Sequence, residues 1–177
     1  MSKISDIAQN YRPPSSTVTV MLSPNDEAVR RREELLREIT EAQKPKPGDR
    51  LTKKSPVDEL RAELEAVEAA EAQFMRTLRF TKLDGLAFAA LTAEHPPRES
   101  VPFDLQLGFN HHAGSLSAAK LNGVDVTDVA EGVPLDDDDW KVIFTVGSGI
   151  DVENIVQTVL ELNVMRSMRT IGRLKKG

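Results

Sequence analysis

The sequence predicts a mainly helical protein with a small antiparallel β element, organised as a helical hairpin arm and a compact helical globular domain. In two segments, apolar and polar residues alternate one by one. Two other segments are highly charged and carry narrow apolar stripes, and short helical patterns with capping residues fill the second half. The expected divisions are a flexible N-terminal arm (1–15), a strand-helix-linker-helix-strand arm (16–80), a helical globular domain (81–165) and a basic tail (166–177).

Two segments have the alternation of strands with one buried face. In Thr17–Leu22, the side chains of Val18, Val20 and Leu22 share one face. In Phe74–Phe80, the large apolar residues fall on one side and polar residues on the other. Both segments are therefore predicted to be strands.

The first helix of the arm is predicted to begin at Ser23-Pro24, where a capping hydroxyl precedes a proline at the first helical position, and to end near Gln43. Its apolar residues make a narrow stripe of Val29, Leu36 and Ile39, with Leu35 beside it. Such a helix can bury one seam but not a broad face.

The second helix of the arm follows a linker that runs from Lys44 to Ser55. Its apolar positions alternate in steps of three and four, the spacing of a coiled-coil seam, and Glu71 interrupts that spacing. The seam consists of Val57, Leu60, Leu64 and Val67. We interpret the two helices as an antiparallel hairpin, which brings the two predicted strands together as a pair.

The globular half is predicted from its helix start and stop signals. A helical pattern over Leu83–Leu91 must end near Ala93, because His95-Pro96-Pro97 cannot continue a helix. Further helices are expected over the segments His111–Leu121, Asp136–Val146 and Asp151–Met165.

Three motifs that suggest chemistry are better explained structurally. Asp136–Asp139 resembles a cation site, but consecutive residues of a helical turn point around the axis, so we interpret it as an acidic helix start. The Gly147–Gly149 segment lacks the third glycine and strand-helix-strand context of a dinucleotide site. His111 and His112 diverge on a helix, and His95 is expected to cap a helix end. We therefore predict no catalytic, cofactor or metal residues, and no enzyme.

Composition and the absence of targeting patterns favour a soluble protein of the cytoplasm. The net charge of -5 disfavours nucleic acid as a partner, and the absence of cysteine excludes disulfides and thiolate chemistry. We expect no membrane partner, because no segment has the roughly 18 apolar residues of a membrane span and the N-terminal residues lack a secretory signal pattern. Self-association into a homo-oligomer is left open.

Several short segments together resemble the tail assembly chaperones of long-tailed bacteriophages, especially siphoviruses of actinobacteria. They are the two segments Phe74–Phe80 and Leu83–Leu91, the stop His95-Pro96-Pro97, Phe109-Asn110, the acidic run ending in Trp140, and Leu160-Glu161-Leu162-Asn163. The resemblance covers roughly residues 16–163. It implies a non-catalytic protein that binds the tape measure protein, tail-tube subunits or both during tail morphogenesis in the host cytoplasm. The alternative is a structural or adaptor component of a phage tail or prophage particle.

Three surfaces are candidates for binding a partner. The first is the seam of the second arm helix, unless the first arm helix already covers it. The second is a groove in the globular half lined by Leu83, Leu86, Leu116 and Trp140. The third is the basic tail, where Arg166 and Arg169 would meet an acidic partner unless the tail is simply solvated.

Overall fold

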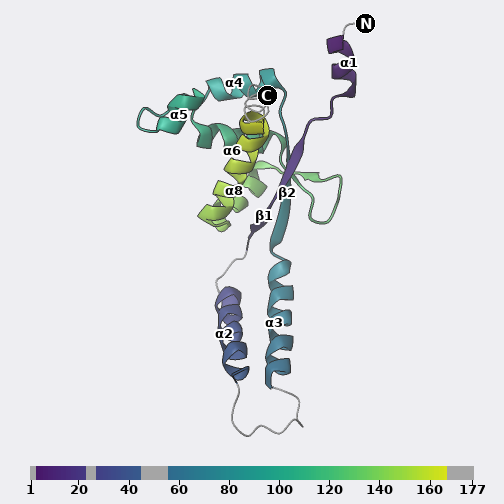
Figure 1. The fold of residues 1–177 in the computed structure, drawn as a ribbon, viewed down its shortest axis with the longest axis vertical. Coiled ribbons are helices and arrows are strands. Elements are labelled where there is room, and N and C mark those ends of the chain that lie inside the picture. Colours follow the sequence, from purple (N-terminus) through teal and green to yellow (C-terminus); the bar gives the residue numbers. More distant parts are fainter. Residues whose placement is uncertain (1–2, 23–26, 45–55, 167–177) are drawn as a thin grey trace, which may run out of the picture. The chain divides into compact units, whose positions relative to one another are not determined.

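The computed structural model describes residues 3–22, 27–44 and 56–166, and it confirms a mainly helical fold with a small antiparallel sheet (Figure 1). In chain order the elements are α1 (Lys3–Asn10), β1 (Ser15–Met21), α2 (Glu27–Ala42), α3 (Pro56–Ala72), β2 (Met75–Thr81), α4 (Gly85–Ala93), α5 (Pro102–Leu107), α6 (His111–Asn122), β3 (Val124–Asp125), β4 (Val133–Pro134), α7 (Asp137–Val146), α8 (Gly149–Leu160) and the π-helical segment η1 (Glu161–Met165).

The chain divides into two compact units. Unit 1 contains residues 1–20 and 76–177, and unit 2 contains residues 21–75. The division falls inside β1 and β2, so most of both strands belongs to unit 1, whereas the sequence analysis assigned both strands to the arm.

The four strands form one sheet in the order β1-β2-β3-β4. The predicted pairing of the first two strands is confirmed. The amide of Lys82 donates to the carbonyl of Pro14, and the amide of Leu22 donates to the carbonyl of Phe74. These two hydrogen bonds fix an antiparallel register. β2 also pairs antiparallel with β3, where Arg79 lies opposite Val124.

The core of unit 1 lies where the inward face of the sheet meets the helices. Val20 and Phe80 of the two long strands are fully buried, as the alternation predicted. Trp140 of α7 is 1% exposed, with its ring centroid 6.4 Å from that of Phe80. α6 and α8 pack side by side (Figure 1), and α8 contributes a fully buried face that includes Ile155.

Unit 2 is the predicted helical hairpin, in which α2 and α3 pack along their lengths (Figure 1). Leu35 is fully buried and Ile39 nearly so, whereas Leu36, expected in the stripe, is 48% exposed. The reason is helical spacing. The inward face of α2 follows Leu35 and Ile39, and Leu36 lies about 100° around the helix axis from Leu35. Glu71, which interrupts the apolar seam, is buried and pairs with Arg32 Nη1 at 3.2 Å.

The predicted helix ends in the second half are mostly confirmed by their caps. Asn110 accepts from the amide of Ala113 at the start of α6, and Asp136 opens α7 in a reciprocal capping box with Asp139. The last helix begins earlier than the predicted Asp151, because Ser148 forms its own capping box with that residue. The start signals at 23–26 and Ser55, and the linker at 45–55, lie outside the described residues.

Four elements were not predicted from the sequence. Helix α1 occupies part of the segment expected to be a flexible arm, where no proline or glycine precedes Tyr11. The short helix α5 starts at Pro102 and ends at Gly108, which has a φ of 81°. Strands β3 and β4 have two residues each, too few for alternation to reveal them.

Candidate partner-binding surface

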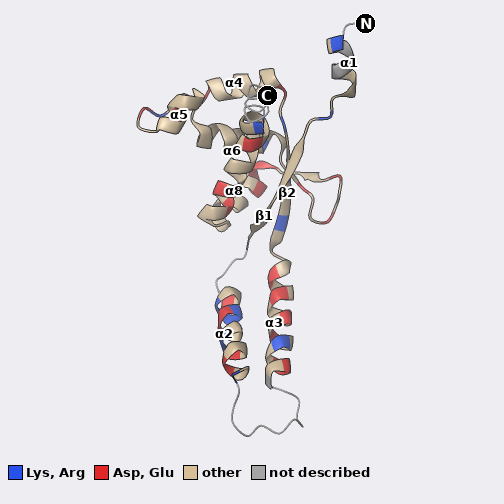
Figure 2. Cartoon of the chain, in the orientation of Figure 1, with Lys and Arg blue, Asp and Glu red and all other residues tan. Residues whose placement is uncertain are grey.

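Helix α4 presents an apolar, uncharged surface in unit 1. Its sequence, GLAFAALTA, is rich in alanine and leucine, which favour helices, and Asp84 caps its start by accepting from the amides of Leu86 and Ala87. The helix ends at Ala93, as predicted from the two prolines that follow. Figure 2 shows α4 without any charged residue, in contrast to α2 and α3.

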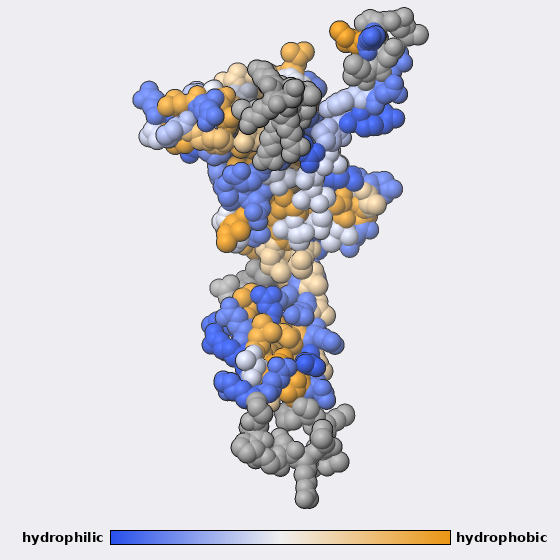
Figure 3. Space-filling view, viewed as in Figure 1, coloured by the Kyte–Doolittle hydropathy of each residue, from blue (hydrophilic) through white to orange (hydrophobic). Residues whose placement is uncertain are grey.

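Within the described part of unit 1, α4 packs on its neighbours along one side. The ring of Phe88 meets that of Phe109 edge-on at 5.8 Å, and Thr92 approaches Gly114 of α6. No residue of α4 is fully buried, and Leu86 is 85% exposed. The space-filling view shows tan and orange surface where α4 lies (Figure 3). An exposed, uncharged helix surface of this kind is a candidate protein-binding site.

A hollow of about 350 Å³ lies between α4 and α6. Its walls are formed by Leu91 and Glu94 on one side and by Ser117, Lys120 and Leu121 on the other. Leu121 is 65% exposed, so its side chain extends the apolar surface of α4 onto α6. We call α4 together with this hollow the α4–α6 groove.

A buried aspartate fixes the segment between these two helices. The carboxylate of Asp104 has no solvent exposure, and it accepts from Arg98 Nε at 2.6 Å and from the backbone amide of His111 at 3.2 Å. His111 Nδ1 also hydrogen-bonds to it. Hydrogen bonding from the Arg98 guanidinium holds the pKa of Asp104 well below its usual range. Because His111 begins α6, this cluster anchors one wall of the groove.

A second histidine, His95, connects the segment after α4 to α6. His95 Nε2 lies 2.8 Å from Ser117 Oγ, so its ring contacts a side chain of α6 and not a free helix carbonyl as expected. The amide of Asn110 donates to the His95 carbonyl. A serine nucleophile would need one imidazole between the carboxylate and the hydroxyl. Here Asp104 contacts His111 whereas Ser117 contacts His95, so no such triad forms.

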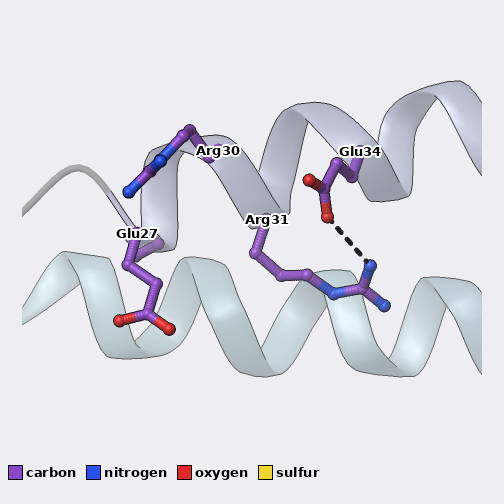
Figure 4. Close-up of a pocket in the computed structure, with 5 residues that line it drawn as sticks. Glu27, Arg30, Arg31 and Glu34 are labelled. Carbon is purple, nitrogen blue, oxygen red and sulfur yellow. Dashed lines mark hydrogen bonds and ion pairs between the residues drawn. The ribbon is translucent and has the colours of Figure 1, made fainter.

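The hairpin unit has a separate, charged hollow of about 610 Å³ at the start of α2 (Figure 4). It is lined by Glu27, Ala28, Arg30, Arg31 and Glu34. Arg31 Nη2 lies 2.6 Å from Glu63 of α3, and this hydrogen bond raises the pKa of Arg31. The hollow is therefore lined by two acidic and two basic side chains, and Arg31 also pairs with Glu34.

The structure places the sequence-predicted binding residues in different environments. Those of the α3 seam, namely Val57, Leu60, Leu64 and Val67, are half-buried in the unit where α3 packs on α2. In unit 1, Leu86 is highly exposed, and Leu83 and Leu116 are half-buried. Arg166 is exposed at the end of the described chain, and Arg169 lies outside the described residues.

Trp140 does not line a surface groove as the sequence analysis expected. Its ring packs between Phe80 and Phe144, which places it in the core. Glu94 and Leu121 were not among the residues predicted to line a groove. A signal for this surface was present, because α4 has nine residues without a single charge.

Among residues 3–22, 27–44 and 56–166, no group of three or more acidic or histidine side chains is arranged to hold a metal ion. Within the same described ranges, no helix is long and apolar enough to cross a membrane. Comparison with known proteins finds no matching family model, no matching curated protein and no matching solved structure.

Proposed function

We propose that this chain is a non-catalytic binding protein of phage tail assembly, which holds apolar helices of the tape measure protein, tail-tube subunits or both in the host cytoplasm until assembly. The observation that carries the proposal is the exposed, uncharged surface of α4, with Leu86 85% exposed. The resemblance of the sequence to tail assembly chaperones supplies the identity of the client.

The energetics suit reversible holding of a client. Burying a leucine side chain that is otherwise exposed contributes roughly 1.5–3 kcal/mol, so a surface with Leu86, Leu121 and several alanines can bind a helix without forming an obligate complex. Binding lowers the concentration of free client by mass action, and a competing partner releases it. The net charge of -5 helps to keep such a complex soluble.

Co-expression tests this function. The chain is produced together with the tape measure protein encoded by its gene neighbourhood, and soluble client is measured after centrifugation. We expect the soluble client to increase several-fold and the chain to be missing from purified particles. An unchanged soluble yield would contradict the proposal, and stoichiometric amounts of the chain in mature tails would favour the structural or adaptor alternative.

A further inference from the structure

We propose that the α4–α6 groove receives a single amphipathic helix whose apolar stripe is flanked by a lysine or arginine, and that this cation pairs with Glu94. The inference rests on the proposed function, because it specifies the chemistry of the client. It identifies one surface among several and gives that surface a charge preference.

The shape of the groove fits one helix. α4 has nine residues and is therefore about 13 Å long, which matches two to three turns of a bound helix. Leu121 on α6 offers an exposed apolar contact and Leu91 lines the hollow, whereas Leu86 lies on another face of α4. Recognition of this kind uses apolar anchors spaced at i, i+3 or i+4, and i+7 on the bound helix.

The charge preference follows from the surroundings of Glu94. This residue is the C-cap of α4, where the helix dipole is negative, and α4 has no basic residue in its last turn. No described residue hydrogen-bonds to its carboxylate or forms an ion pair with it. A second negative charge at a negative helix end is unfavourable, so a cation from a bound partner would be stabilised there.

The basic residue of the groove, Lys120, extends toward α7. Lys120 Nζ lies 4.0 Å from Asp137 Oδ1 and 5.8 Å from the centroid of the Phe144 ring. An acidic partner would meet the like charge of Glu94 on the opposite wall. The groove therefore favours a partner helix that places a positive charge beside its apolar stripe.

The test uses two synthetic helical peptides of about 18 residues, long enough to form helices. Both carry the same leucine stripe, and they differ only in flanking residues, which are arginine in one and glutamate in the other. Binding of each labelled peptide to the full chain is measured by fluorescence anisotropy. We expect the arginine peptide to bind about tenfold more tightly than the glutamate peptide.

Variants of the full chain locate the effect. Glu94→Gln should remove most of the preference and Glu94→Arg should reverse it, whereas Leu121→Glu should weaken binding of both peptides by about tenfold or more. Asp138→Asn is the matched charge control, because it removes one exposed negative charge from α7. Ile150→Glu is the matched apolar control, because Ile150 is 74% exposed at the start of α8, outside the groove. Circular dichroism verifies that each variant folds.

Several outcomes would overturn the inference. One is an equal loss of preference in Asp138→Asn, which would assign it to the net charge of the chain. Another is self-association of the unmodified chain that the peptide disrupts, since a second copy would then be the occupant. If Leu121→Glu still solubilises a co-expressed client, the groove is refuted and the proposed function stands. If the peptides discriminate as expected but no client is solubilised, the proposed function fails and the groove stands.

Discussion

Replacing Gly123 by alanine should destabilise unit 1, because there is no space for a methyl group at this position. Gly123 follows α6 with a φ of -70°, so its backbone suits any residue. A Cβ placed there would lie 2.7 Å from a ring carbon of Trp140 and 2.7 Å from the carbonyl oxygen of Ala119. It would also lie 3.0 Å from the ring of Phe80, and each of these atoms is in or beside the core.

The magnitude follows from this crowding. The two nearest distances are roughly 0.7 Å short of ordinary van der Waals contact, so the Trp140 ring or the end of α6 must move. Overpacking of this kind costs about 1–3 kcal/mol. The reduced entropy of the unfolded chain offsets about 0.4–1 kcal/mol of that cost. The free energy of unfolding should therefore fall by about 1–2 kcal/mol for Gly123→Ala.

Urea unfolding followed by tryptophan emission measures this change directly. Trp140 is the only tryptophan of the chain and is 1% exposed, so its emission should shift to the red when unit 1 unfolds. With a urea m-value of about 1–3 kcal/mol/M, the midpoint should fall by roughly 0.3–2 M. Gly85→Ala is the matched control, because no atom lies within 4 Å of a Cβ at Gly85. A midpoint for Gly123→Ala equal to or above that of the unmodified chain would refute the packing argument.

Two further predictions test the remaining parts of the fold. The pKa of Asp104 is lowered in the folded state, so its contribution to stability is present above its unfolded pKa of about 3.9 and is lost as the pH falls below that value. Asp104→Asn should therefore lower the urea midpoint at neutral pH and reduce its dependence on pH in acid; parallel pH profiles would contradict this. In the hairpin, Leu35→Ala should cost about 2–4 kcal/mol and Leu36→Ala less than about 0.5 kcal/mol, because only Leu35 is buried. Thermal unfolding by circular dichroism compares the two, and equal losses would argue against this packing.

Local signals in the sequence were sufficient to predict much of the fold. The alternation around Val18 and Phe80 indicated the strands because the sheet buries one face, and period two is a direct result of that geometry. Capping residues such as Asn110 and Asp136 indicated helix starts because their hydrogen bonds involve amides only three residues away. These features depend on neighbours along the chain, so one sequence is enough to find them.

The candidate surface was harder to predict because it depends on which distant residues meet. Sequence reasoning placed Trp140 on a surface, although its ring fills the core against Phe80, sixty residues earlier in the chain. The groove joins Glu94 to Leu121 only because α4 packs on α6. Leu86 was named as a candidate residue, and its 85% exposure depends on which face of α4 packs on unit 1.

The position of the hairpin unit within the chain has a topological consequence. β1 and β2 are neighbouring antiparallel strands, joined near the division by the hydrogen bond from Leu22 to Phe74. Unit 2 is therefore the connecting loop of a β-hairpin, enlarged until it contains two helices of its own. Because the entropy of closing a loop grows by only about 0.6 kcal/mol for each doubling of its length, such a loop can gain or lose helical turns at little cost to the strands that it joins. The length of the helical hairpin formed by α2 and α3 can thus vary independently of the sheet and the α4–α6 groove.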